Sequence, residues 1–145
     1  MSAGSKKQTV GYKYYLGAHI GLCHGPIDFI KEIQIDKKVA WSGFGIEGKF
    51  ISIESPALFG GEKREGGVSG RVDIEMGSPS QGTNGYLASQ LGPDIPAFRG
   101  IAAVVLNQVY VGNNPYLKPW KFLAARTQVT SDGVNQWQTC SNFQK

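Results

Sequence analysis

The chain has 145 residues, enough for one domain with a buried core but short for two. Apolar residues make up 41% of it and charged residues 18%, and 20 positions are glycine, a balance typical of a β-rich domain with many turns. The net charge of +4 is scattered, and no apolar run approaches the ~20 residues of a membrane span, so neither sequence-specific nucleic-acid binding nor membrane insertion is expected.

The chain is expected to form one domain with two polar ends. Residues 1–10 are polar and are predicted to form a flexible N-terminal arm. A β-rich domain is predicted over residues 11–130. The polar stretch 131–145 is predicted to be a C-terminal tail.

Four strands are predicted in the first half of this domain, at residues 12–23, 30–35, 38–41 and 50–54. In the first of them, Gly17 and Gly21 disfavour a helix and favour a bent or bulged strand. Asp36-Lys37-Lys38 lies where a hairpin turn would join the second strand to the third. Residues 42–48 carry three glycines and are predicted to form a loop.

The second half contains the clearest strand pattern, at residues 68–76, where apolar and polar side chains alternate. Asp73 and Glu75 share its polar face and are expected to be exposed. A short helix capped by Thr83 or Asn84 is predicted next. Two further strands are predicted at 101–111 and 120–129. Six to eight strands and one short helix predict a mainly β domain, either a barrel or a packed pair of sheets.

His19, Cys23 and His24 are the one cluster with metal-ligand residue types. On a strand, His19 and Cys23 share a face while His24 points away, and zinc needs four ligands or three with a water. The fourth would have to come from Cys140 or a carboxylate. Cys23 and His24 are neighbours on a strand and their side chains point apart, so they cannot easily form a hydrogen-bonded nucleophile–base pair. We therefore expect no metal, no cofactor and no catalytic residue, and both cysteines are expected to be free thiols.

Gly43, Gly45 and Gly48 match the G-x-G-x-x-G pattern of dinucleotide-binding folds. In those folds the glycines open a helix whose N-terminus meets the pyrophosphate. A predicted strand follows them here, so the pattern does not indicate a cofactor site.

Two features are candidates for protein–protein contact. The first is a loop in which two glycine pairs frame four charges, and which is either a mobile surface loop or a segment that orders against a neighbouring subunit. Its candidate residues are Phe59, Glu62, Lys63, Arg64 and Glu65. The second is the concentration of Tyr and Trp at 12–15 and 110–120, which serves either as core or as interface anchors, with Tyr116 and Trp120 as the candidates.

Several segments, in the same order along residues 9–126, resemble the tail hub or tip attachment proteins of long-tailed bacteriophages. The N-terminal ones are Val10-Gly-Tyr-Lys-Tyr-Tyr-Leu-Gly-Ala-His, Leu22-Cys-His-Gly-Pro-Ile-Asp and Ile35-Asp-Lys-Lys-Val-Ala-Trp-Ser-Gly. The later ones are Leu58-Phe-Gly-Gly-Glu-Lys-Arg-Glu-Gly-Gly-Val-Ser-Gly, Pro96-Ala-Phe-Arg-Gly and Gly112-Asn-Asn-Pro-Tyr-Leu-Lys-Pro-Trp. Members of that family are much longer, so the resemblance is to an N-terminal portion.

The resemblance implies a virion structural protein of a phage or prophage tail tip, made in the bacterial host cytoplasm. Such baseplate hub proteins are β-rich and usually trimeric. They join the tail tube to the tip or fibre proteins used in host attachment. No catalytic residue is implied in this region.

Two functions of other classes stay open as alternatives. A small β domain that binds a ligand such as a carbohydrate would use Trp41, Trp120 or Tyr116 as stacking platforms in a groove. A zinc enzyme would be built around the histidines and cysteine of the first strand. A structural, non-enzymatic role is the one we expect.

Overall fold

The computed structural model describes residues 11–46 and 48–126, which form seven strands and one helix. The strands are β1 (Tyr14–His24), β2 (Phe29–Ile35), β3 (Lys38–Gly45), β4 (Phe50–Ser55), β5 (Val68–Glu75), β6 (Ile101–Gly112) and β7 (Trp120–Ala125), and the helix is α1 (Gly85–Leu91). The predicted mainly β class is confirmed. Part of the predicted last strand, together with the predicted arm and tail, lies outside the described residues.

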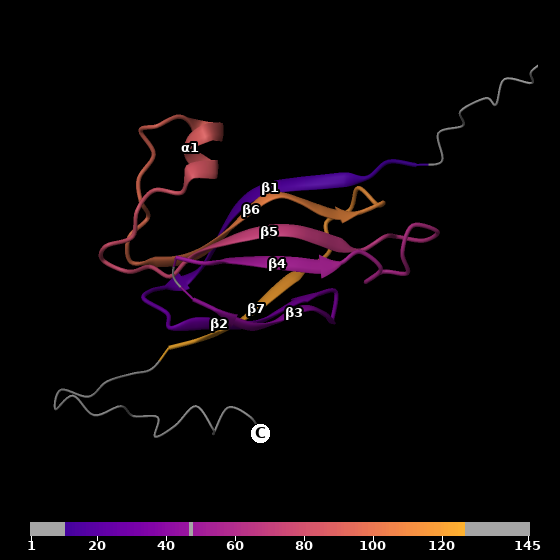
Figure 1. Cartoon of the computed structure of the whole chain (residues 1–145), viewed down its shortest axis with the longest axis horizontal. Helices are drawn as coiled ribbons and strands as arrows, with labels where there is room; N and C mark the ends of the chain where they lie inside the picture. The colour runs from indigo at the N-terminus through magenta and orange to yellow at the C-terminus, as the bar shows by residue number, and fades with distance from the viewer. Residues whose placement is uncertain (1–10, 47, 127–145) are drawn as a thin grey trace, which may run out of the picture.

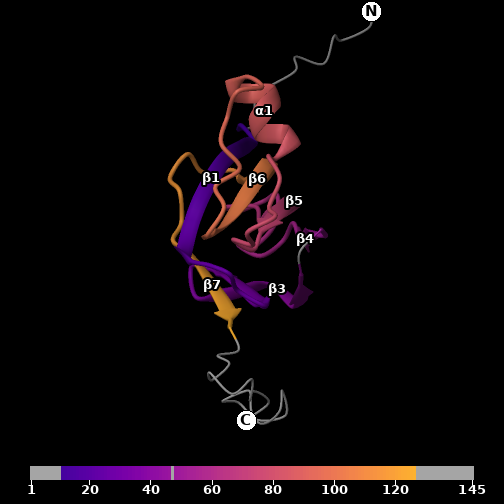
Figure 2. The same ribbon diagram turned by 90° about the vertical axis from the view of Figure 1, so that its left-hand side faces the viewer.

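The strands form two antiparallel sheets, in the orders β1-β6-β5-β4 and β3-β2-β7 (Figure 1). Figure 2 shows the three-stranded sheet on one side of the four-stranded sheet and α1 on the other. Within the described part of the chain the sheets do not close into a barrel. Of the two predicted architectures, the packed pair of sheets is therefore the one adopted.

A single apolar core lies between the two sheets. Ile53, Val72 and Leu106 of the four-stranded sheet and Ile33 of the other have no exposed side-chain surface. The first two and Ile33 alternate with polar residues along their strands, so each of those strands turns its apolar face toward the other sheet. Residues 102–106 of β6 are buried on both faces of their sheet. Burial of this apolar surface is the main force that holds the sandwich together.

The β2–β3 hairpin is closed as predicted, by a two-residue turn. Asp36 and Lys37 have φ values of 50° and 65°, and positive φ at both turn residues matches the right-handed twist of a hairpin. The prediction of a loop at 42–48 is wrong for its first half, because β3 continues to Gly45 and pairs there with Ile30. A Cβ atom at Gly45 would lie 2.7 Å from Ile74 Cδ1, so this glycine permits close packing within a strand.

The first strand is irregular, as its glycines predicted. Its pairing with β6 shifts register at three places. At Gly17, a Cβ atom would lie 2.2 Å from the Tyr86 hydroxyl oxygen, so the glycine lets this tyrosine lie across β1. A shift on β6 accompanies a positive φ of 49° at Gln108.

The outer face of the four-stranded sheet is covered at one end by residues 77–100, which include α1. Of the two predicted N-cap candidates, Asn84 is the one that caps the helix. Its Oδ1 accepts a hydrogen bond from Leu87 N at 3.0 Å. Leu87 is buried against the sheet. No helix among the described residues is long and apolar enough to cross a bilayer.

The expectation that Glu75 is exposed is wrong, because this covering segment buries it. Its side chain is 6% exposed, and Oε2 lies 2.9 Å from His19 Nε2. The His19 ring meets the ring of Phe98, from the covering segment, edge-on with centroids 4.7 Å apart. Alternation along β5 correctly placed Glu75 on the outer face but carried no information about what packs on that face.

Candidate interaction surface

Three connections meet at one end of the sandwich: the β2–β3 turn at 36–37, the β4–β5 loop at 56–67 and the β6–β7 loop at 113–119 (Figure 1). We call these segments the loop end. It contains most of the residues that the sequence marked as interface candidates. The first two are hairpin connections, and the third crosses from the four-stranded to the three-stranded sheet.

The glycine-framed loop is ordered by the chain's own hydrogen bonds. Gly66 N donates to Gly61 O at 2.9 Å, and Phe59 N donates to Gly66 O at 2.9 Å, so the loop folds back on itself. Asn113 N donates to Glu65 O at 3.0 Å and joins it to the β6–β7 loop. Contact of this loop with a neighbouring subunit stays a prediction.

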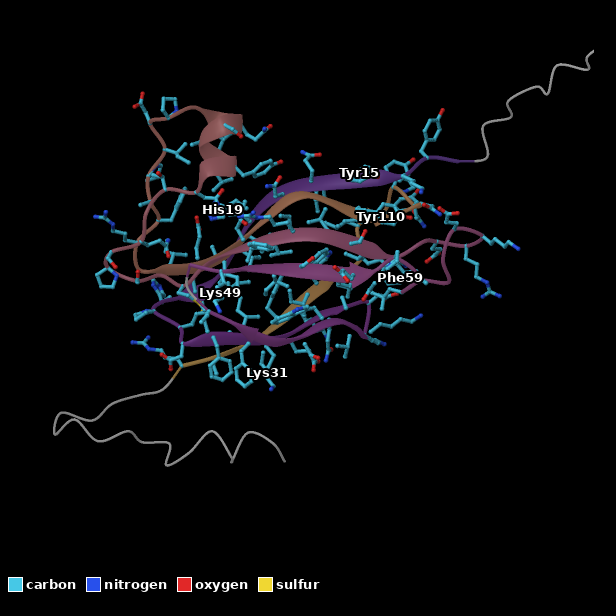
Figure 3. The ribbon with its side chains drawn as sticks, viewed as in Figure 1. Tyr15, His19, Lys31, Lys49, Phe59 and Tyr110 are labelled. Atoms are coloured by element: carbon cyan, nitrogen blue, oxygen red, sulfur yellow. The ribbon has the colours of Figure 1, made fainter. Side chains whose placement is uncertain are left out.

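The five candidate residues of this loop divide into one anchor and four surface charges. Phe59 is 8% exposed and belongs to the core (Figure 3), so it anchors the loop and is not available for contact. The charged residues Glu62, Lys63, Arg64 and Glu65 are exposed. Glu62 Oε1 pairs with Lys13 Nζ at 3.0 Å, which raises the pKa of that lysine.

Lys118 ties all three connections of the loop end together. Its Nζ lies 2.8 Å from Glu65 Oε2 and 3.6 Å from Asp36 Oδ2, and 4.8 Å from the centre of the Phe59 ring. The hydrogen bond with Glu65 raises the pKa of Lys118, and the same bond lowers the pKa of Glu65. Sequence reasoning missed this residue, because nothing local to Lys118 indicates partners on two distant hairpins.

The two aromatic candidates have different environments. Tyr116 is 81% exposed, and its neighbour Leu117, which sequence reasoning also missed, is 62% exposed. Asn114 Oδ1 accepts a hydrogen bond from Tyr116 N at 3.0 Å, which fixes the backbone at the tip of the loop. Trp120 is partly buried against the core and stacks on Phe122 with centroids 6.1 Å apart. Tyr116 therefore belongs to the surface, and Trp120 mainly to the core.

A second aromatic pair lies close to the loop end. The rings of Tyr15 on β1 and Tyr110 on β6 lie 5.7 Å apart (Figure 3), and Tyr15 is 59% exposed. The Tyr110 hydroxyl donates to Asn113 Oδ1 at 2.6 Å. The loop end therefore combines exposed apolar and aromatic side chains with a charged rim, the composition of a protein–protein contact.

The residues considered for other chemistry are not brought together. His19 pairs with Glu75, Cys23 is exposed on β1, and Cys140 lies outside the described residues. No group of three potential metal ligands occurs in residues 11–46 and 48–126. Gly43 and Gly45 lie in β3, and the strand β4 follows the glycine pattern where a dinucleotide-binding fold has a helix.

The stacking platforms considered for a carbohydrate do not line one groove. Trp41 and Trp120 pack against the core, and Tyr116 stands alone at the tip of its loop. No protein-family model and no curated protein matches this sequence. The function is therefore inferred from the residues and their arrangement.

Proposed function

We propose that this chain is a structural, non-catalytic domain of a phage or prophage tail tip, a hub that links the tail tube to the host-attachment apparatus. The observation that carries the proposal is the ordered series of segments over residues 9–126 that resemble tail hub proteins. The proposed location is the virion, after synthesis in the host cytoplasm. The proposed partners are tail tube and tip or fibre proteins, and further copies of the chain in a trimer.

The arrangement of two of these segments supports the proposal. The stretch that begins at Leu58 and the stretch that begins at Gly112 are far apart in sequence, and both contribute to the loop end. They are joined by the Asn113 N to Glu65 O hydrogen bond and by the Lys118–Glu65 ion pair. The distinctive segments thus build one ordered surface, as expected of a domain whose role is assembly.

Tyr116 and Leu117 are the proposed centre of contact with a neighbouring copy. An exposed aromatic and aliphatic pair on a fixed backbone loses little conformational freedom on binding. The surrounding charges form the rim, where they favour correct partners more than they add affinity. Apolar anchors within a charged rim are typical of protein–protein contacts.

Light scattering across a concentration series tests this assembly role. We expect a mass of about three times 15.7 kDa at high concentration. Leu117→Ser should shift the equilibrium toward the monomer. Leu91→Ser is the matched control, because Leu91 is 71% exposed but lies at the end of α1, away from the loop end. A monomer at every concentration, or an equal effect of both substitutions, would contradict the assembly role of this surface.

A further inference from the structure

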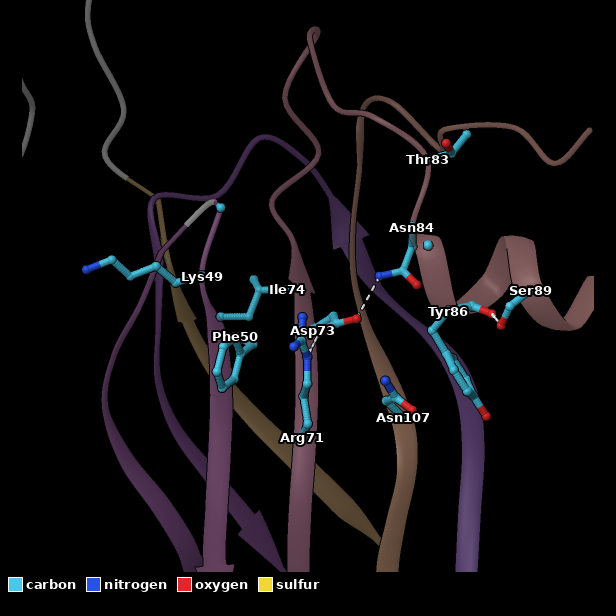
Figure 4. A pocket seen from close by; sticks show the side chains of 12 residues that line it. Lys49, Phe50, Arg71, Asp73, Ile74, Thr83, Asn84, Tyr86, Ser89 and Asn107 are labelled. Atoms are coloured by element: carbon cyan, nitrogen blue, oxygen red, sulfur yellow. Dashed lines mark hydrogen bonds and ion pairs between the residues drawn. The ribbon is translucent and has the colours of Figure 1, made fainter. Parts of the chain in front are cut away.

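A polar cleft lies on the outer face of the four-stranded sheet, between strands β4, β5 and β6 and the N-terminal end of α1 (Figure 4). Its volume is about 510 Å³, within the roughly 300–1,000 Å³ typical of small-molecule sites. The side chains that matter for its chemistry are those of Phe50, Arg71, Asp73, Tyr86 and Asn107. The cleft is separate from the loop end, and the assembly proposal does not account for it.

Arg71 is held in one orientation at the floor of the cleft. Its Nε donates to Asp73 Oδ1 at 2.6 Å, and its guanidinium carbon lies 4.2 Å from the centre of the Phe50 ring. Asp73 Oδ2 accepts a hydrogen bond from Asn84 Nδ2 at 2.9 Å. Both oxygens of the carboxylate are thus engaged, while the terminal Nη groups of Arg71 have no hydrogen-bond partner among the described residues. The cleft therefore presents a fixed, planar donor group.

Asn107 adds a second polar group beside Arg71. The two residues are directly paired across β5 and β6, so their side chains leave the same face of the sheet as neighbours. Asn107 is only partly exposed, and its side-chain amide makes no hydrogen bond to any residue in the described part of the chain. It offers two donors and an acceptor next to the free edge of the guanidinium.

Aromatic rings flank these polar groups on both sides. In Figure 4, Phe50 lies on one side of Arg71 and Asn107, and Tyr86 on the other. Phe50 is 54% exposed. The Tyr86 hydroxyl is held by Gln108 Nε2, which donates to it at 2.8 Å. Ring faces and edges beside planar polar side chains suit a ligand that has both C–H surfaces and many hydroxyl groups.

We propose that this cleft binds a saccharide unit that carries a carboxylate, of the uronic acid type. The free Nη groups of Arg71 pair with the carboxylate, and the Asn107 amide bonds ring hydroxyls. Phe50 and Tyr86 contact the C–H surfaces of the sugar. A carboxylate is favoured over a neutral sugar because the one acid in the cleft is already neutralised by Arg71 and bonded by Asn84, which leaves an excess of donors.

Isothermal titration of the full chain with three probes at one ionic strength tests the proposal. The probes are D-glucuronate, D-glucose and acetate. We expect D-glucuronate to bind at least about tenfold more tightly than either of the others, because only it satisfies both the guanidinium and the hydroxyl-binding groups. No binding of D-glucuronate, or equal binding of acetate, would overturn the proposal.

Substitutions locate the binding site and separate it from folding. Arg71→Ala and Asn107→Ala should each weaken D-glucuronate binding by about tenfold or more, and Asn107→Ala breaks no hydrogen bond to a described residue. Arg71→Lys should also weaken binding, because it keeps the charge and loses the planar fork. The matched control is Arg64→Ala, an exposed arginine of the loop end. The assignment is overturned if the Asn107→Ala and Arg71→Lys variants keep both the melting temperature and the D-glucuronate affinity of the parent, because the sugar then binds elsewhere.

Discussion

Two segments leave the sandwich between strands, the loop at 56–67 and the covering segment at 77–100, and they are held in opposite ways. The loop is anchored by one buried side chain, Phe59, and is otherwise fixed by backbone hydrogen bonds and exposed ion pairs at the edge of the molecule. The covering segment is fixed by buried side chains, among them Gln81 and Leu87. The difference teaches that one apolar anchor with polar bonds is enough to hold a surface loop here, whereas the segment that lies on a sheet is held by several buried side chains.

Gln81 shows how the covering segment is held. The residue is 6% exposed, and its Oε1 accepts a hydrogen bond from Gly77 N at 2.7 Å. Its Nε2 donates to Ala97 O at 2.8 Å and to Phe98 O at 3.1 Å, so one side chain joins both ends of the segment. A buried amide that loses such partners costs far more than an exposed ion pair.

The largest effect is expected from Leu106→Ala, in the core between the two sheets. Leu106 is completely buried between the sheets, and truncation should lower the free energy of unfolding by about 3 kcal/mol. Urea denaturation measures this loss. Hydrogen exchange should become faster in both segments, because both are exposed when the domain unfolds as a unit, and a change confined to one of them would contradict cooperative unfolding.

Gln81→Ala should loosen the covering segment and leave the loop at 56–67 unchanged. Loss of its three hydrogen bonds leaves the buried Gly77 N without a partner and removes the side-chain donor from Ala97 O and Phe98 O, and we expect a loss of about 2 kcal/mol in unfolding free energy. Hydrogen exchange should accelerate at 77–100 and stay unchanged at 56–67. Gln90→Ala, at an exposed position of α1, is the control and should have little effect. Equal acceleration in the loop would show that the segments are not held independently.

Asn113→Ala is the corresponding test at the loop end. It removes the acceptor of the Tyr110 hydroxyl, and Tyr110 is 9% exposed, so a loss of about 1 kcal/mol is expected. Thermal unfolding followed by circular dichroism measures it. The light-scattering mass of this variant should also shift toward the monomer. A variant that loosens 77–100 instead would contradict the assignment of Asn113 to the loop end.

The smallest effect, and the one that depends on pH, is expected from Glu65→Gln. Lys118 lowers the pKa of Glu65 in the folded protein, so the ion pair stabilises the fold at any pH above the ordinary pKa of 4.5. This stabilisation is lost as the pH falls through the lowered pKa of Glu65 in the folded protein. The pKa of Lys118 is raised, so at the alkaline end the contribution is lost only as pH rises through a value above 10.5.

Melting temperatures of the Glu65→Gln variant and the parent should therefore differ slightly at pH 7 and converge in acid below the folded pKa of Glu65. High salt should also reduce the difference, since the pair is exposed. Lys63→Met is the control, because no ion pair of Lys63 to another described residue is present. A difference that persists in strong acid would show that Glu65 acts through something other than its charge.

Local patterns predicted most of the strands and the helix cap. Alternation located β5, and the Asp36-Lys37 turn located the β2–β3 hairpin. Alternation did not extend β3 to Gly45, because glycine carries no apolar signal even where its small size permits the packing. The loop residues of the candidate interaction surface were identified from their composition, but the burial of Phe59 was not.

What the sequence by itself determined is the β-rich class, the hairpins and the face of each strand, since these depend on residues close together along the chain. Only the tertiary structure decided that Glu75 is buried beside His19, that Lys118 joins three connections, and that Arg71 and Asn107 share a cleft beside α1. Each of these contacts depends on which strands are neighbours and on what covers a sheet. Those properties are set by packing between distant segments and leave no periodic signal in the sequence.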